Sequence, residues 1–224
     1  MTFSLALTDP ATGRLGMAVS SSSPAVAARC VNLRAGVGAA SSQNVTNPGL
    51  GPLALDLLEA GLTPDEVAAR LPEHDEHIAY RQVTVLDAQG RSAVFEGTGT
   101  LGTHAFAQAP GAVAAGNMLA DPTVPQAMVD AALASTAPQL EQRLLAGLAA
   151  GLARGGEAGP VRSAGLAVVA DRPWLLTDLR VDDADEPIAE LSRLLELWLP
   201  QRDDYAVRAV HPEAAPSYGV PGDE

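Results

Sequence analysis

Short apolar runs separated by turn residues predict that residues 2–44 form strands. Phe3–Leu7 is one such run, and Leu15–Ser20 returns as its hairpin partner after the turn-forming residues 8–14. Residues 34–43 are predicted to form a further strand, whose small side chains let another segment approach its backbone closely. The first hairpin therefore places residue 2 at the end of a sheet, with later strands beside it.

Helical spacing of apolar residues appears later in the chain. It predicts helices within residues 47–72, 123–153 and 184–199. One helix start is marked by Thr63 as N-cap, with Pro64 and Glu66 completing a capping box. Hairpin patterns fill the ranges between the helices, 80–116 and 163–179. Strand pairs that alternate with helix pairs favour an α+β fold, in which antiparallel sheets carry helices on their outer faces.

The hydrophobic pattern also bounds the domain. Residues 1–200 carry the periodic segments and are predicted to form a single domain. Residues 201–224 are rich in Pro and without period, so we expect an extended or disordered C-terminal arm.

Charge and composition narrow the possible partners. The net charge is −13, and all the basic residues are Arg because the chain contains no Lys. An anionic surface argues against nucleic acid and acidic membranes as partners. No apolar run is long enough to span a bilayer, no signal peptide is recognisable, and Cys30 is the single cysteine. These features predict a cytoplasmic protein.

Thr2 is the first candidate for chemistry. If Met1 is removed, Thr2 carries its hydroxyl and a free α-amine on neighbouring carbons, which supplies a nucleophile and a general base in one residue. Thr is also a common second residue that has no role beyond permitting removal of the initiator Met. The residue alone leaves both interpretations open.

Several separated motifs strengthen the catalytic interpretation. They are Thr2–Ser4, Asp9–Gly16, Met17–Ser21, Arg34–Ala39, Gln43, Thr46–Pro48, Leu55–Gly61, Gly116–Leu119 and Asp178–Asp183. In this order they resemble an uncharacterised bacterial family of the Ntn-hydrolase (N-terminal nucleophile hydrolase) superfamily, with a proteasome-like fold. The resemblance spans residues 2 to about 200. It implies a four-layer αββα sandwich of two antiparallel sheets flanked by helices, and amide hydrolysis by the N-terminal residue.

The resemblance implies a role for Arg34 and Thr2. Thr2 would be the nucleophile, with its own α-amine as base. Related enzymes with a Thr nucleophile place a Lys beside it, and Arg34 could replace that Lys electrostatically without carrying a proton. A solvated Arg at the end of a strand is the alternative for Arg34.

Four further residues complete the expected site. Asn117 is a candidate oxyanion donor, with an Asx-turn residue as the alternative. Ser21 could bond the α-amine, and the backbone N–H groups of Ser42 and Gln43 could face the oxyanion. Ser22 and Ser23 stand where relatives carry a basic and then an aromatic residue, which indicates a different pocket wall.

Other motifs give weaker signals. The stretch from His74 to His77 invites a metal interpretation, but no third ligand is placed nearby, so we expect no metal. Gly97–Gly102 matches a dinucleotide motif without the helix that such a site requires, and no cofactor is expected. The sequence thus favours an amidohydrolase that acts on a small-molecule or peptide amide, and a homodimer is expected. The alternative is a non-catalytic scaffold of the same fold that binds a small ligand or a partner protein.

Overall fold

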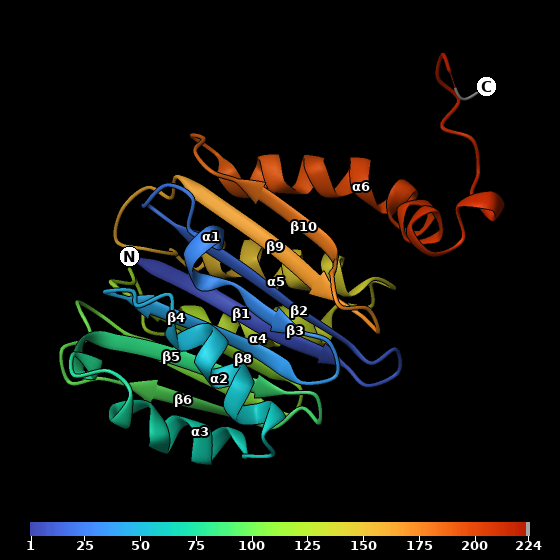
Figure 1. The fold of residues 1–224 in the computed structure, drawn as a ribbon. Helices are drawn as coiled ribbons and strands as arrows, with labels where there is room; N and C mark the ends of the chain where they lie inside the picture. The colour runs from blue at the N-terminus through green and yellow to red at the C-terminus, as the bar shows by residue number, and fades with distance from the viewer. Residues whose placement is uncertain (223–224) are drawn as a thin grey trace.

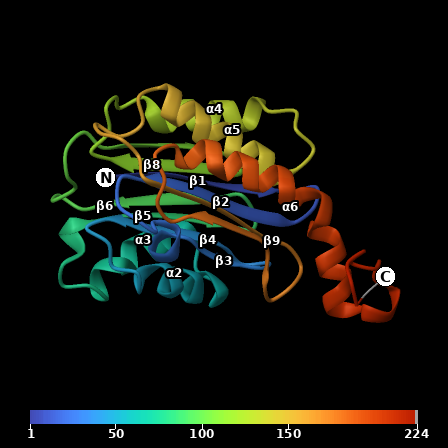
Figure 2. The ribbon, with the colours of Figure 1, turned by 90° about the horizontal axis from the view of Figure 1, so that it is seen from above.

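Two antiparallel sheets lie face to face in the computed structural model, which describes residues 1–222 (Figure 1). The larger sheet has six strands in the order β10-β9-β2-β1-β8-β7, and the smaller has four in the order β3-β4-β5-β6. Figure 2 shows α2 and α3 outside the smaller sheet and α4, α5 and α6 on the larger one. The expected α+β sandwich of two antiparallel sheets is therefore confirmed.

The element bounds follow the predicted blocks. The strands of the larger sheet are β1 (Thr2–Asp9), β2 (Arg14–Ser21), β7 (Ala105–Ala109), β8 (Ala112–Asn117), β9 (Ser163–Val169) and β10 (Leu175–Val181). Those of the smaller sheet are β3 (Asn32–Arg34), β4 (Gly38–Asn44), β5 (Arg81–Asp87) and β6 (Ser92–Glu96). The helices are α1 (Ala27–Cys30), α2 (Leu50–Glu59), α3 (Pro64–Arg70), α4 (Val124–Ala134), α5 (Leu140–Ala153) and α6 (Pro187–Val210). Within residues 1–222, none of these helices has the length and apolar character needed to cross a bilayer.

β1 lies near the middle of the molecule because its two faces pack against different layers. Phe3, Leu5 and Leu7 belong to the core under α4 and α5. Ala6 packs between the sheets against β4, β5 and β8. Side chains alternate along a strand, so Thr2 and Ser4 face the space between the sheets, as Ala6 does. The N-terminal residue of the central strand is thus directed into the interior of the sandwich.

The segment predicted as one strand of small residues forms a hairpin instead. Gly36 has a φ of +70°, which L side chains rarely adopt, and it turns the chain between β3 and β4. Arg34 consequently pairs with Gly38 across this hairpin. The prediction of a continuous strand from residue 34 to residue 43 was wrong because a glycine turn was hidden among small apolar residues.

α6 continues to Val210, past the expected start of the arm at residue 201. Pro200 lies within it, and the helix changes direction before its C-terminal part (Figure 1). Arg202, just after this proline, is 3 % exposed and donates to the fully buried carboxylate of Glu141 on α5 at 2.9 Å. Thr177 on β10 donates to the same carboxylate oxygen. This buried ion pair fixes the second half of α6 to the body of the protein.

We predict that the Arg202–Glu141 pair is strongly coupled. Arg202→Met should lower the free energy of unfolding by about 3–5 kcal/mol, because it leaves the Glu141 charge buried without a positive charge beside it. Adding Glu141→Gln should recover at least about 1 kcal/mol of that loss, since the uncompensated charge is gone. Urea unfolding of the two single variants and the double variant measures this coupling.

The matched control is Arg193→Met. It breaks an exposed pair with Glu190 and should leave the stability nearly unchanged. Additive effects of Arg202→Met and Glu141→Gln would show that the two buried groups do not stabilise each other.

Candidate functional site

Thr2 lies in the middle of the larger sheet, with a neighbouring strand on each side. It is 5 % exposed and pairs directly with Asn117 of β8. On the other side, Phe3 pairs with Ser20, which places Ser21 at the end of β2 beside Thr2. Directly paired residues have their side chains on the same face of a sheet, so Thr2 and Asn117 face the interior together.

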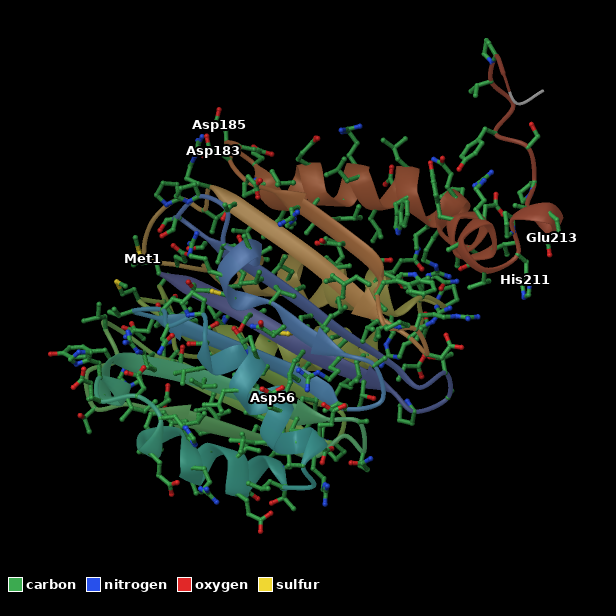
Figure 3. The ribbon with its side chains drawn as sticks, viewed as in Figure 1. Met1, Asp56, Asp183, Asp185, His211 and Glu213 are labelled. Atoms are coloured by element: carbon green, nitrogen blue, oxygen red, sulfur yellow. The ribbon has the colours of Figure 1, made fainter. Side chains whose placement is uncertain are left out.

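The carbonyl oxygen of Met1 occupies the space beside the Thr2 hydroxyl. Thr2 Oγ1 and Ser21 Oγ each donate to it at 2.5 Å. Figure 3 shows Met1 at the end of the sandwich where β1 begins. While Met1 is present, the backbone nitrogen of Thr2 is an amide and its hydroxyl is occupied, so this form carries no free N-terminal nucleophile.

A chain of buried side-chain hydrogen bonds joins the two sheets next to Thr2. Ser4 donates to Gln43 Oε1 at 2.7 Å, and Gln43 Nε2 donates to Gln82 Oε1 at 2.7 Å. Gln82 Nε2 in turn donates to the carboxylate of Glu96 at 2.7 Å. A carboxylate can only accept, so Glu96 fixes which way each amide in the chain points.

The direction of these hydrogen bonds determines which atom of the Asn117 side-chain amide is left without a partner. Its Nδ2 donates to Gln82 Oε1 at 3.1 Å, which leaves Oδ1 as the free end of the amide. Oδ1 is buried and has no hydrogen-bond partner within residues 1–222. A buried acceptor without a partner is costly, and a donor placed beside it would be stabilised. The sequence predicted Asn117 as an oxyanion donor, whereas this orientation presents an acceptor near Thr2.

Ser42 and Gln43 take different positions from each other on β4. Gln43 faces the space between the sheets, through its bond to Ser4. Ser42 lies on the opposite face, the one on which Ala40 packs against α2. β3 pairs with β4 only from Gly38 to Ala40. Residues 41–44 of β4 pair with β5 on one edge, and their other edge has no strand beside it in the described part of the chain. Backbone groups on that edge remain candidates for the predicted oxyanion donors.

The serine run after β2 forms a braced turn. Ser21 Oγ accepts from the backbone N–H of Ser23 at 3.1 Å. Ser163 on β9 donates its hydroxyl to the carbonyl of Ser23 at 2.6 Å, and it accepts from the backbone N–H of Val26. These bonds hold Ser21 in place, so the run has a structural role as well as supplying the hydroxyl near Thr2.

Glu157 is a site residue that the sequence analysis missed. It is 3 % exposed, and its two carboxylate oxygens accept from the backbone N–H of Ser22 at 2.9 and 3.1 Å. Burial raises the pKa of Glu157, while the hydrogen bonds from Ser22 and the positive charge of the nearby N-terminus act against that rise. It follows Gly155 and Gly156, whose φ angles of +117° and +56° turn the chain from α5 towards the N-terminus. A Glu after such a glycine pair was the available sequence signal.

The structure does not bring Arg34 to Thr2. Gln43 lies at the Thr2 end of β4 through its bond to Ser4, whereas Arg34 pairs with Gly38 at the opposite end of that strand. Its guanidinium is instead held by two carboxylates of α2, those of Asp56 at 2.8 Å and Glu59 at 2.7 Å. Asp56 lies well away from Met1 in Figure 3. The sequence interpretation of Arg34 as the charge beside the nucleophile is therefore corrected: it is a partly exposed ion-pair residue of the β3–β4 hairpin.

The stretch from His74 to His77 serves a structural purpose. Asp75 is 9 % exposed, and it accepts from Arg81 Nε at 2.9 Å and from Asn47 at 2.9 Å. Arg81 also donates to the carbonyl of Val45 at 2.6 Å. No group of three or more His, Cys, Asp or Glu side chains suited to a metal ion occurs among residues 1–222. The ion pair braces the start of β5, one residue before Gln82.

Most of this chain matches one protein family. The model of a family described as "Family of unknown function (DUF1028)" matches residues 2–191. The chain belongs to this family. A search of curated proteins found no match.

A solved structure of a DUF1028 protein has the same fold. It is the crystal structure of protein SPO2555 from Silicibacter pomeroyi, which is 31 % identical in sequence with a TM-score of 0.84. The similarity covers 92 % of this chain and 89 % of that one. The likeness extends over nearly the whole of both chains, and neither the family description nor the structure's title states an activity.

We predict that Asp75 stabilises this DUF1028 protein in a pH-dependent way. The bond from Arg81 lowers the pKa of Asp75 to about 2, against opposition from burial. Because the folded pKa is below its ordinary value of 3.8, the contribution is complete above about pH 4 and is lost as the pH falls towards 2. Asp75→Asn should lower the free energy of unfolding by about 2 kcal/mol at pH 7, and the difference from wild type should shrink below pH 4.

Denaturant unfolding at a series of pH values measures this difference. Glu76→Gln, an exposed change in the same loop, is the control and should follow the wild-type curve. A constant gap between wild type and Asp75→Asn down to pH 2 would contradict the assignment.

Proposed function

We propose that this protein is an amidohydrolase in which Thr2 is the nucleophile once Met1 has been removed. One observation carries the proposal: a buried acceptor, Asn117 Oδ1, has no partner within the described residues and lies on the strand paired with Thr2. A free α-amine on Thr2 would be a donor in that position. This fits the implied membership of the Ntn-hydrolase superfamily.

The proposed reaction uses Thr2 for both acid–base and covalent steps. The Thr2 α-amine accepts the hydroxyl proton as Oγ1 attacks the carbonyl carbon of the substrate amide. The tetrahedral intermediate collapses as the protonated amine gives its proton to the leaving nitrogen. Water, deprotonated by the same amine, then attacks the ester that links the acyl group to Thr2. The bond to Oγ1 breaks as the protonated amine returns its proton to Oγ1, which releases the carboxylic acid and restores Thr2.

The neighbouring residues support these steps in distinct ways. Ser21 Oγ and Asn117 Oδ1 would accept hydrogen bonds from the α-amine and orient its lone pair towards Oγ1. Neighbouring N–H groups of a strand point to opposite edges, so one of the two backbone N–H groups of Ser42 and Gln43 faces the open edge of β4, where it would stabilise the oxyanion. Glu157 would place a negative charge close to the amine. None of these roles requires a Lys, which the chain lacks.

The substrate class proposed is a small-molecule or peptide amide. A second candidate function, a non-catalytic scaffold that binds a small ligand or a partner protein, is favoured by one observation. Thr2 is nearly inaccessible and its hydroxyl is bonded to the Met1 carbonyl, which is the arrangement of an unprocessed chain. The expected dimer and cytoplasmic location stay predictions.

We predict that the purified protein lacks Met1 and that Thr2 carries the activity. Intact-mass spectrometry should show loss of one Met, and Thr2→Ala should lower amidase turnover by at least about 10³-fold, because it removes the hydroxyl that attacks the substrate and carries the acyl group. Thr2→Ser keeps both the hydroxyl and the α-amine and should retain measurable activity and a trappable acyl-enzyme. Complete retention of Met1, or unchanged turnover in Thr2→Ala, would favour the scaffold.

We also predict that Glu157 sets the pH range of the reaction. A nearby anion favours the protonated form of an amine, so Glu157→Gln should move the acidic limb of the kcat/KM profile to lower pH by about one unit. Glu76→Gln, on an exposed loop, is the control and should leave the profile in place. If turnover is normal and the limb does not move, Glu157 has no influence on the base while Thr2 can still be the nucleophile.

A further inference from the structure

Met1 occupies the space that an acyl group on Thr2 would fill. Its carbonyl carbon is bonded to the Thr2 nitrogen, and the Thr2 hydroxyl donates to its carbonyl oxygen at 2.5 Å. In the proposed reaction the acyl group of the substrate is bonded instead to Thr2 Oγ1, which is joined to that nitrogen through Cα and Cβ alone. Met1 in the unprocessed chain is therefore the N-linked counterpart of the acyl-enzyme, and its surroundings describe the acyl pocket.

The end of the Met1 side chain lies against Gly159. A Cβ added at Gly159 would lie 3.8 Å from Met1 Cε and would meet no other atom within 4 Å, its chain neighbours apart, in the part of the chain that the structure describes. Gly159 does not have a positive φ, so its backbone also suits residues with a side chain. The missing side chain at this position leaves the room that the unbranched side chain of Met1 fills.

The segment of residues 157–159, which follows α5, is anchored at the end of β8. The backbone N–H of Ala158 donates to the carbonyl of Met118 at 3.0 Å, and Glu157 forms a β-bridge with Leu119. Met118 and Leu119 come directly after β8, the strand that pairs with the start of β1. The surroundings of Met1 are thus fixed by the same strand end as the candidate site.

The α-amine of Met1 lies within electrostatic reach of a buried carboxylate. Burial raises the pKa of the Glu157 carboxyl and of the Cys30 thiol, and the positive charge of the Met1 amine acts to lower both. Glu157 accepts from the backbone N–H of Ser22, and a carboxylate has further acceptor sites beyond these bonds. Glu157 can therefore also accept from an ammonium group that stands where the amine of Met1 stands.

Removal of Met1 takes this positive charge away from Glu157. The Thr2 α-amine has to be neutral when it acts as the base, so it does not balance the carboxylate during the attack. The arginines nearest in sequence are engaged elsewhere: Arg29 donates to two backbone carbonyls, and Arg162 pairs with two aspartates before α6. An ammonium group on the substrate would supply the charge that a buried carboxylate requires.

We propose that the substrate is an α-aminoacyl amide with a free α-amine and an unbranched apolar side chain, which binds where Met1 lies. The proposal rests on the proposed function, because the pocket opens only when Met1 has been removed. The ammonium group of the substrate faces Glu157, and the end of its side chain lies against Gly159. As the bond from Thr2 Oγ1 to the acyl carbon forms and the C–N bond breaks, the leaving nitrogen takes the proton that the Thr2 amine received from Oγ1.

The test compares p-nitroanilide substrates on mature protein, prepared by cleaving an N-terminal fusion so that Thr2 is the first residue. The kcat/KM for L-methionine p-nitroanilide should be at least about tenfold higher than for its N-acetyl derivative, which cannot balance the buried charge. It should also be at least about tenfold higher than for L-alanine p-nitroanilide, which buries less apolar surface. Equal values for the free and acetylated substrates, both lost in Thr2→Ala, would overturn the substrate class and leave the amidohydrolase standing.

Two variants assign the two contacts. Glu157→Gln should reduce the preference for the free amine over the N-acetyl substrate to less than about twofold, and this ratio cancels any effect on the base. Gly159→Val should lower kcat/KM for the methionine substrate at least about tenfold more than for the alanine substrate, because the added methyl groups fill the end of the pocket. Ala153→Val, an exposed change on α5, is the control and should leave both ratios unchanged. Ratios that neither pocket variant alters would overturn the assignment.

A binding measurement separates failure of this proposal from failure of the proposed function. Thr2→Ala protein prepared from the same fusion lacks the nucleophile but keeps the pocket, so isothermal titration calorimetry should show saturable binding of L-methioninamide and none of N-acetyl-L-methioninamide. Protein cleaved to retain Met1 should bind neither compound, because its own Met1 fills the pocket. Absence of L-methioninamide binding would overturn the pocket whether or not the protein hydrolyses amides. Binding without hydrolysis of any amide by the wild type would contradict only the amidohydrolase.

Discussion

The two sheets of this protein are held in register by a row of hydrogen bonds between buried side chains. Ser4, Gln43, Gln82 and Asn117 come from four different strands, and Glu96 fixes the direction of the row. Sliding one sheet against the other would leave several of these polar groups buried without partners, at about 1–3 kcal/mol for each. The apolar contacts between the sheets, such as those of Ala6, Met17 and Leu86, would tolerate small shifts, so the polar row specifies the alignment. It also fixes where the end of β1 lies.

The fold could be predicted largely from the sequence because the alternation of apolar residues reports which face of a strand is buried. The capping box at Thr63 was visible for a similar reason, since both of its partners lie within one helical turn. Local rules failed where a turn was made from residues that also suit a strand. Gly36 shows this, since it turns the chain between β3 and β4 inside a segment predicted as one strand.

The candidate site was predictable only in part, for a related reason. Ser21 lies near Thr2 because a hairpin of known length joins their strands, and that length can be counted. The position of Arg34 relative to Thr2 depends on how the two sheets are aligned, and no short segment of sequence encodes that alignment. The position of Glu157 near the N-terminus depends on the route of the chain from α5 to β9. Its burial results from the packing of segments that are distant in the sequence. The glycine pair before Glu157 marks a turn in the sequence, but the burial of the carboxylate shows only in the tertiary structure.

The hydroxyl group of Ser21 beside the N-terminus has a consequence for the removal of Met1. Met1 presents an acceptor to Ser21, whereas a chain beginning at residue 2 would present a cationic donor at nearly the same place. A side chain that could only donate or only accept would suit one of these states and oppose the other. A hydroxyl oxygen does both by rotating its hydrogen, without moving a heavy atom. Ser21 is therefore compatible with both ends of a cleavage that reverses the hydrogen-bonding polarity of its surroundings.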